Sequence, residues 1–141
     1  MAVLVLDTRA LEVIADHRAD PAAARRVQSM LTSAARLGVP VRVPTAVLAE
    51  AYRGIPGDTA IDRVLRQGIR PITMAQAMSR LAGALKNRDK LNSCHTVDAF
   101  VVATAARLGG GIVATGDPDD LRFLARDHPN IRVEAVSPTR R

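Results

Sequence analysis

The sequence predicts an α/β domain with a parallel sheet flanked by helices. Short runs rich in Val, Leu and Ile alternate with longer segments of helical periodicity, and this alternation is typical of strands joined by helical crossovers. The strand candidates are apolar at successive positions, as expected of strands that are buried on both faces. Glycine or proline marks the ends of several segments, which supports the same division of the chain.

Length and composition indicate one domain with an ordinary core. The chain has 141 residues, of which 48% are hydrophobic but only 2% are aromatic, so Val, Leu, Ile and Ala must fill the interior. We expect a single domain over residues 1–136 and a flexible polar tail over 137–141. The net charge of +6 is compatible with a phosphate-rich partner, although charge alone does not decide this.

Several function classes are disfavoured. Cys94 is the only cysteine, which excludes an intrachain disulfide and a cysteine-based zinc site. Asp7 and Arg9 interrupt the apolar start of the chain, unlike a signal peptide. The apolar runs are too short to cross a membrane. We therefore expect a cytoplasmic protein that has no membrane contact.

The first half of the chain carries two candidate acids. The apolar run Met1–Leu6 predicts a buried strand, and Asp7 follows it at the edge where parallel sheets place ligand chemistry. Asp7 could also cap the next helix, over residues 8–18, and both roles can hold together. A helix over 21–38 and a strand over 39–43 lead to a third helix that begins near Thr45. Glu50 lies on or beside the inward face of that helix, so it is either a buried site residue or a boundary residue that reaches solvent.

The middle of the chain carries structural signals. Asp58 is a candidate N-cap for a short helix over 58–68, and Ile69–Ile72 predicts a weak edge strand because it contains a proline. Thr73 is a candidate cap for a helix over 74–88. The Met and Leu stripe of that helix indicates core packing and no cofactor site.

The stretch from His95 to Leu121 contains two further candidate acids, Asp98 and Asp117. Its helix over 97–108 is apolar nearly all round and therefore buried, yet Asp98 stands in the first turn, where a charge–dipole contact could also explain it. A glycine turn and the strand Ile112–Thr115 follow. Asp117 comes next and is also a good N-cap for a helix over 118–126. A last strand is expected over 131–136.

The joint placement of Asp7, Glu50, Asp98 and Asp117 predicts a metal site. Acids that follow parallel strands share one edge of the sheet, and helices that begin at that edge bring their first turns there. Four carboxylates packed together repel one another, and Mg²⁺ or Mn²⁺ relieves that repulsion because these hard cations prefer oxygen ligands. Such a site suits phosphodiester hydrolysis, in which the metal activates a water while the basic surface holds the polynucleotide.

Three segments, VLVLDTRALEVI, PTAVLAEAYRG and TVDAFVVATAARLGGGIVATGDPDDL, occur in the order and spacing of a known family. The chain resembles the PIN domain over nearly its whole length, most closely the VapC-type toxins of bacterial toxin–antitoxin pairs. The resemblance implies a three-layer α/β/α sandwich and a Mg²⁺- or Mn²⁺-dependent endoribonuclease that cleaves structured RNA such as tRNA or rRNA. It also implies a homodimer that is inhibited by a cognate VapB-type antitoxin, whose C-terminal segment covers the acidic pocket.

The resemblance assigns a role to each acid. By position, Asp7 and Asp98 are metal ligands, and Glu50 binds the metal directly or through water. Asp117 binds metal or positions the attacking water. Some family members carry the last acid three residues later, so Asp120 competes with Asp117.

Members of the family often have a polar residue two positions after the first acid. In this chain that position is occupied by Arg9. Arg9 could contact phosphate, and Arg53 and Arg122 are further candidates because they lie near the acids in sequence. A haloacid-dehalogenase-like phosphatase would need an Asp in place of Arg9. A response-regulator receiver would need a Lys after a late strand, which the chain lacks. A catalytically silent PIN-like binding module and a stand-alone PIN nuclease without an antitoxin stay open.

Overall fold

The computed structural model describes residues 2–88 and 93–137 and contains a five-stranded parallel sheet in the order β3-β2-β1-β4-β5. The elements in chain order are β1 (Val3–Leu6), α1 (Thr8–Ala15), α2 (Pro21–Leu37), β2 (Val41–Pro44), α3 (Thr45–Ala51), α4 (Asp58–Leu65), β3 (Ile69–Ile72), α5 (Gln76–Arg88), the 3₁₀ turn η1 (Ser93–His95), α6 (Thr96–Arg107), β4 (Gly111–Thr115), α7 (Pro118–Leu124) and β5 (Ile131–Ala135).

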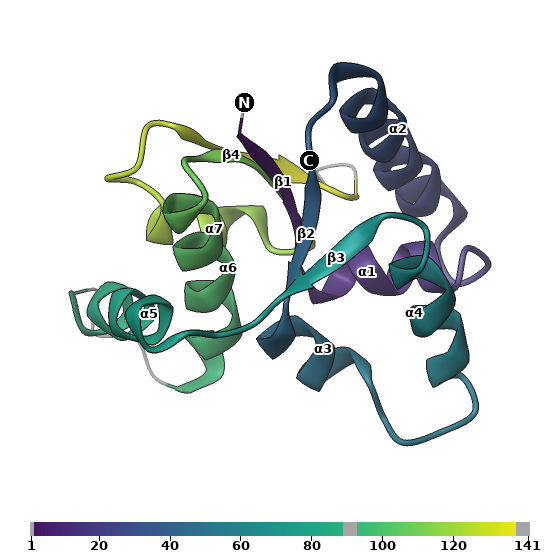
Figure 1. Cartoon of the computed structure of the whole chain (residues 1–141), viewed down its shortest axis with the longest axis horizontal. Coiled ribbons are helices and arrows are strands. Elements are labelled where there is room, and N and C mark those ends of the chain that lie inside the picture. The colour runs from purple at the N-terminus through teal and green to yellow at the C-terminus, as the bar shows by residue number, and fades with distance from the viewer. Residues whose placement is uncertain (1, 89–92, 138–141) are drawn as a thin grey trace.

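Helices cover both faces of the sheet. Figure 1 shows α1, α2 and α4 on one side and α5, α6 and α7 on the other, while α3 lies near the carboxyl ends of the strands. This arrangement confirms the predicted three-layer α/β/α sandwich. The strand order reverses direction at β1, the central strand, which pairs with β2 on one side and β4 on the other. Ligand sites of open α/β sheets form at the carboxyl edge beside such a strand.

Burial explains why these segments are strands and helices. All four residues of β1 are buried, as the continuous apolar run predicts for a central strand. The longest helix, α2, begins with Pro21 after the N-cap Asp20 and ends at Gly38, whose φ of 68° is left-handed. A residue with a side chain would be strained there, so glycine ends this helix at low cost.

A small apolar cluster joins α5 to α6. It contains buried Met78 and Ala82 on α5 and buried Ala99 and Ala103 on α6. The small alanine side chains let the two helices approach closely, and methionine fills the remaining space. This packing confirms that the methionine stripe of α5 belongs to the core.

The structure corrects two predicted caps. Asp58 does not cap α4: its carboxylate accepts hydrogen bonds from the backbone N–H groups of Arg53 and Gly54 at 2.8–3.2 Å, and so fixes the preceding loop. The helix predicted to follow Thr73 begins only at Gln76. The expected tail falls mostly on residues 138–141, and part of the polar connection before α6 falls on 89–92; both lie outside the described residues.

No helix within residues 2–88 and 93–137 combines the length and the apolar character needed to cross a bilayer.

Candidate functional site

Asp7 is fixed at the carboxyl end of β1. Its side chain is 5% exposed, with Oδ1 accepting from the N–H of Ala10 at 2.9 Å and Oδ2 accepting from the N–H of Gly116 at 3.1 Å. Asp7 therefore both caps α1 and ties β1 to the turn after β4. Burial raises its pKa, and the charge of Asp117 adds to this, although hydrogen bonds from Thr115, Ala10 and Gly116 act in the opposite direction.

Asp98 stands in the first turn of α6 and is half-buried. Its pKa is raised from 3.8 to about 6, first by burial and then by neighbouring charges. The neighbours that raise it, in decreasing order, are Asp117, Asp7 and Asp120, while His95 lowers it. Three acids distant in sequence thus act on one carboxyl group, which shows that they share one electrostatic environment.

Asp117 follows β4 at the N-cap position of α7, yet its carboxylate makes no capping hydrogen bond. Its backbone N–H donates to Oγ1 of Thr115 at 2.8 Å, which sets the turn, and its side chain is exposed. Capping therefore does not account for an acid here. Asp120 also influences Asp98 but does not line the pocket described below.

Glu50 lies near the end of α3 and is exposed. It is therefore a boundary residue that reaches solvent and not a buried one. Its Oε1 accepts a hydrogen bond of 2.6 Å from Oγ1 of Thr8, at the start of α1. This contact holds the carboxylate of α3 next to the residue that follows Asp7.

One hollow of about 230 Å³ is lined by all four predicted acids, Asp7, Glu50, Asp98 and Asp117. We call it the acid pocket. The side chains that complete its lining are Thr8, Arg9, Glu12, Cys94 and Val97. Sequence reasoning did not identify Thr8, Glu12 and Cys94 as lining residues of the site. Each lies within about one helical turn of a predicted acid, and this nearness in sequence is the signal that could have identified them.

The acids surround the pocket without closing on one point. In the described part of the chain, no group of three or more His, Cys, Asp or Glu side chains is arranged to hold a metal ion. Asp7 is held by its hydrogen bonds and Glu50 by Thr8, whereas the side chain of Asp117 is exposed and makes no capping hydrogen bond. The chemistry of the donor set, carboxylates alone, fits a hard divalent cation.

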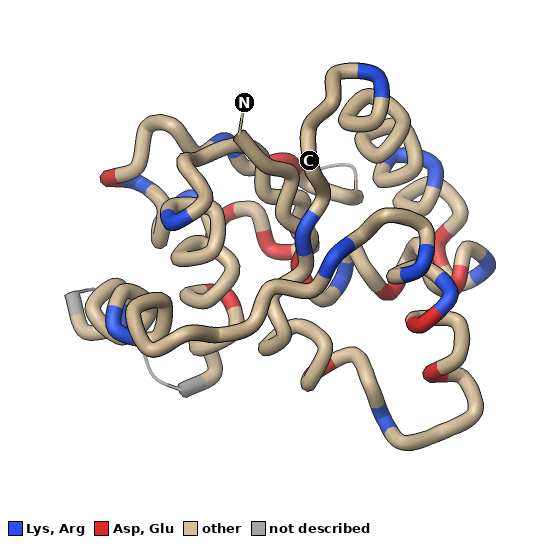
Figure 2. Tube along the Cα trace, viewed as in Figure 1, with Lys and Arg blue, Asp and Glu red and all other residues tan. Residues whose placement is uncertain are grey.

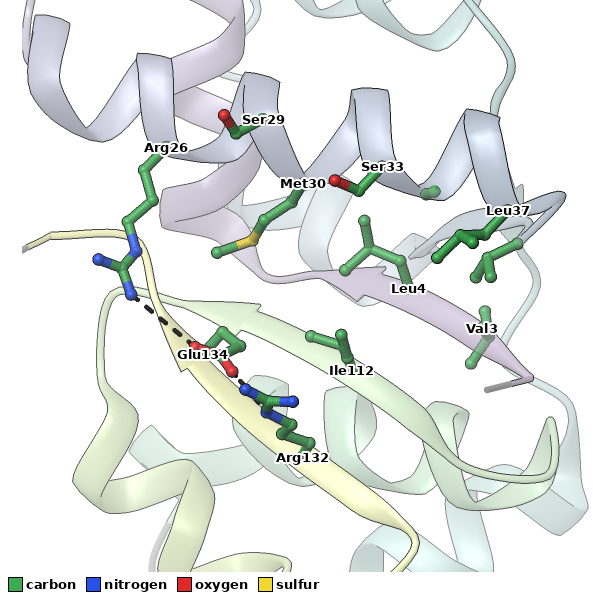
Figure 3. A pocket seen from close by; sticks show the side chains of 12 residues that line it. Val3, Leu4, Arg26, Ser29, Met30, Ser33, Leu37, Ile112, Arg132 and Glu134 are labelled. Carbon is green, nitrogen blue, oxygen red and sulfur yellow. Dashed lines mark ion pairs between the residues drawn. The ribbon is translucent and has the colours of Figure 1, made fainter.

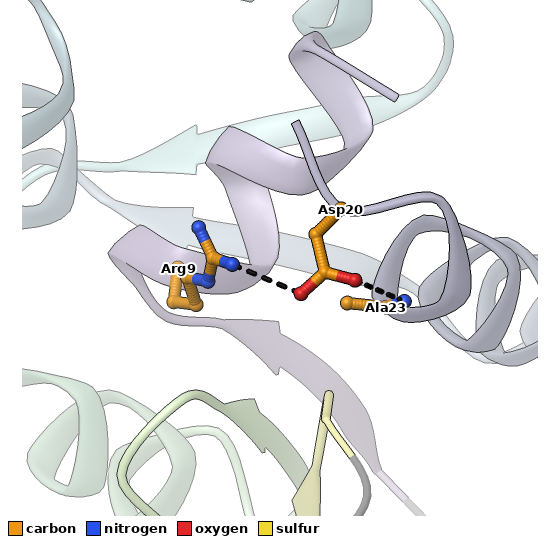
Figure 4. A network of polar contacts seen from close by, with 3 residues as sticks. All are labelled: Arg9, Asp20 and Ala23. Atoms are coloured by element: carbon orange, nitrogen blue, oxygen red, sulfur yellow. Dashed lines mark hydrogen bonds and ion pairs between the residues drawn. The ribbon is translucent and has the colours of Figure 1, made fainter. Parts of the chain in front are cut away.

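Among the described residues, Arg9 is the one basic residue in the lining of the acid pocket. Figure 4 shows its guanidinium directed at Asp20: Nη2 lies 3.0 Å from Oδ2, while Oδ1 of Asp20 accepts from the N–H of Ala23 at 3.1 Å. A Cβ on Gly116 would lie 2.6 Å from Cγ of Arg9. The Arg9 stem therefore packs against the turn that carries Asp117, and only glycine fits between them.

The two other arginine candidates lie elsewhere. Arg53 lines a neighbouring hollow of about 280 Å³, which shares Arg9 and Glu12 with the acid pocket. Arg122 lies on α7, where it forms an exposed ion pair with Asp119 at 3.7 Å. Arg9 is thus the candidate that the structure brings directly to the acids.

A larger hollow of about 330 Å³ lies between α2 and the sheet and contains none of the four acids. Figure 3 shows its apolar floor, with Leu4 and Ile112 facing Met30 of α2. At its rim, Glu134 pairs with Arg132 at 2.6 Å and with Arg26 at 3.8 Å. These charges are paired with one another, so this hollow does not offer the chemistry of the acid pocket.

No protein-family model matches the sequence, and no curated protein matches it. Among solved structures, the chain is similar to one described as VapBC2 from Rickettsia felis bound to a DNA fragment from their promoter. The TM-score is 0.64 and the sequence identity 14%, over 94% of this chain and 98% of that chain. At this identity the likeness concerns the fold, and it shows that the parallel sheet and its two helical layers form a PIN-like α/β/α sandwich.

Proposed function

We propose that this chain is a Mg²⁺- or Mn²⁺-dependent endoribonuclease that acts as the toxin of a VapBC-type toxin–antitoxin pair. The observation that carries the proposal is the acid pocket: four carboxylates from β1, α3, α6 and the turn after β4 line one small hollow at the carboxyl edge of a PIN-like sheet. The similar fold of a chain in the VapBC2 structure supports the same reading.

The electrostatics of the acid pocket support a cation. Asp7 and Asp98 both have raised pKa values, and the charge of Asp117 contributes to each. Keeping these groups ionised together is costly in the absence of positive charge. Within the described residues, none of the four acids forms an ion pair with Lys or Arg, so a divalent cation is the counter-charge that the site lacks.

The residues have distinct roles in the proposed site. Asp7, Asp98 and Asp117 would hold the metal, with Asp7 as the rigid member and Asp117 as the member that rotates inward. Glu50, held by Thr8, would bind the metal through water or accept a proton from the attacking water. The metal would supply an activated water and neutralise charge on the phosphate. Arg9, which lines the acid pocket, would contact a phosphate oxygen by leaving its ion pair with Asp20.

The proposed partners follow from this function. The substrate would be a structured RNA such as tRNA or rRNA, and the inhibitor a cognate VapB-type antitoxin that covers the acid pocket. We also propose a homodimer. Co-expression with the product of the neighbouring gene tests the partner: a stable complex without RNA cleavage supports a toxin, whereas free activity without such a partner supports a stand-alone nuclease.

The proposed activity is tested with purified protein and a structured RNA, in Mg²⁺, Mn²⁺ or EDTA. Metal-dependent cleavage that Asp98→Asn abolishes supports the proposal. RNA binding without cleavage, in protein free of antitoxin, would favour the catalytically silent module. Asp119→Asn is the matched control, because Asp119 carries the same charge nearby but does not line the acid pocket.

A further inference from the structure

Two arginines stand side by side on neighbouring strands of the sheet. Arg42 of β2 and Arg70 of β3 are Cα partners in the parallel register, so their side chains leave the same face of the sheet about 4.8 Å apart. Among the Cα partners of neighbouring strands in the described sheet, this is the pair in which both residues are charged. Figure 2 shows basic segments on these two neighbouring strands.

Within the part of the chain that the structure describes, the pair has no counter-charge. Among residues 2–88 and 93–137, neither guanidinium forms an ion pair with a carboxylate. Arg42 donates from Nη1 to the carbonyl of Val41 at 2.8 Å and is half-buried, while Arg70 is exposed. Like charges that face each other across strands destabilise a sheet, so this arrangement costs stability unless an anion binds there.

Protection of the sheet edge explains only half of the pair. Charged residues on edge strands discourage pairing with other chains, and Arg70 lies on the edge strand β3. Arg42, however, lies on β2, between β3 and β1. A charge on an interior strand beside another like charge needs a different explanation.

The arginine pair lies on the same side of the sheet as Asp98. Leu4 and Ile112 point toward α2 (Figure 3), and Val41 pairs with Leu4. Because successive residues of a strand alternate between faces, Arg42 and its partner Arg70 point to the opposite side, which α6 covers over β1, β2 and β4.

The distance to the acid pocket is short. Arg42 is the Cα partner of Val5, two residues before Asp7. Ideal sheet spacings then place the Cα atoms of Arg42 and Arg70 roughly 8 and 12 Å from that of Asp7. A polynucleotide held in the acid pocket could therefore reach both arginines without crossing the sheet.

We propose that Arg42 and Arg70 form a second RNA contact, which binds the phosphate backbone beside the segment held in the acid pocket. This inference rests on the proposed function, because it takes RNA as the polyanion. Arginine suits phosphate contacts, since its planar fork donates two hydrogen bonds to one phosphate. The contact would be independent of sequence and would set affinity and register of the strand.

The experiment measures binding of a fluorescent single-stranded RNA in EDTA, where cleavage is absent, at several KCl concentrations. The double variant R42Q/R70Q keeps most of the aliphatic stems, and R25Q/R36Q on exposed positions of α2 removes the same charge. For R42Q/R70Q we expect Kd to rise about tenfold and the salt slope to fall by about 1.4, as two lost phosphate contacts predict. R25Q/R36Q should change Kd less than about threefold, and R42K/R70K should keep the salt slope but recover only part of the affinity, because lysine keeps the charge and loses the planar fork.

Equal effects of the two double variants would overturn the inference, because net charge alone would then explain binding. Thermal melting separates a structural role: R42Q/R70Q should melt at the same temperature or higher, because repulsion is removed, and a marked fall would also overturn the inference. The proposed nuclease activity is tested separately with a short oligonucleotide. Its cleavage should require metal and should be lost in Asp98→Asn.

Discussion

The hydroxyl of Thr8 donates a 2.6 Å hydrogen bond to the carboxylate of Glu50, although 42 positions separate them in the chain. The bond joins the first turn of α1 to the end of α3. Glu50 is exposed, so its own helix does not fix the side chain; Thr8 does. The residue next to buried Asp7 thus positions the exposed carboxylate of Glu50.

Replacing Thr8 with valine keeps the side-chain shape and removes the donor. We expect the cleavage rate to fall roughly three- to tenfold, because Glu50 loses its preferred orientation. The free energy of unfolding should change by less than about 1 kcal/mol, since the lost bond is exposed to water. Thr32→Val, which removes an exposed hydroxyl bonded within α2, is the control for both rate and melting temperature. Equal rates in the two variants would contradict a role for Thr8.

Asp98→Asn should stabilise the metal-free protein at pH 7.5. The pKa of Asp98 is raised from 3.8 to about 6, so the folded state binds this proton more tightly than the unfolded state. The resulting stability is fully present below about pH 3.8 and is lost as the pH rises through about 6. At pH 7.5 the ionised group therefore lowers stability, by less than the roughly 3 kcal/mol that the full difference in pKa implies, because solvent screens this partly exposed carboxyl group.

Thermal melting in EDTA at pH 7.5 and at pH 4 checks this prediction. Asp98→Asn should melt above the wild type at pH 7.5, and the difference should shrink at pH 4, where the wild-type carboxyl group is protonated. Asp119→Asn, outside the acid pocket, should show no such pH-dependent gain. A large loss of stability in Asp98→Asn would instead mean that Asp98 chiefly stabilises the start of α6.

Much of this architecture follows from local sequence patterns. The apolar run of β1, the glycine after α2 and the proline in β3 each carry a strong local signal, and the structure has a central strand, a helix end and an edge strand at these places. Asp7, Asp98 and Asp117 could be grouped because a parallel sheet brings strand ends and helix starts to one edge. This grouping requires only the order of the elements and the parallel direction of the strands.

Other features depend on contacts between distant residues and could not be read locally. Asp58 has the composition of a helix cap, but it binds the N–H groups of the preceding loop. The choice between a buried and an exposed Glu50 depends on Thr8 and on the packing of α3. The pairing of Arg42 with Arg70 depends on the register of β2 and β3, which hydrophobic pattern alone does not specify when strands are this short.

Asp117 should matter more for cleavage than Asp120. Asp117 lines the acid pocket and leaves its capping position unused, whereas Asp120 acts on Asp98 only through its charge. We expect Asp117→Asn to reduce cleavage by more than about 100-fold and Asp120→Asn by less than about tenfold, as for a ligand compared with a distant charge. Single-turnover cleavage of one defined RNA measures both. The reverse order would make Asp120 the fourth acid of the site.

Gly116→Ala should disturb the acid pocket through packing. The new Cβ would lie 2.6 Å from Cγ and 2.7 Å from Cβ of Arg9, so the turn or the arginine must move, and the Gly116 N–H bond to Asp7 weakens. We expect a loss of about 1–3 kcal/mol in the free energy of unfolding, together with reduced cleavage. Urea unfolding measures the first effect.

Gly83→Ala is the matched control for this packing argument. Gly83 lies within α5, and a Cβ there meets nothing within 4 Å. Alanine should therefore stabilise the helix by about 0.5–1 kcal/mol and leave cleavage unchanged. If Gly116→Ala were as harmless as Gly83→Ala, the close contact between Arg9 and the turn would not constrain the site.

The central claim is that the four acids form one metal-dependent catalytic site. Its most direct test is cleavage of total cellular RNA by purified, antitoxin-free protein in Mn²⁺, Mg²⁺ or EDTA, beside Asp98→Asn and Asp119→Asn. We expect discrete fragments that require metal, disappear in Asp98→Asn and persist in Asp119→Asn. Cleavage that survives EDTA or the loss of Asp98 would contradict it.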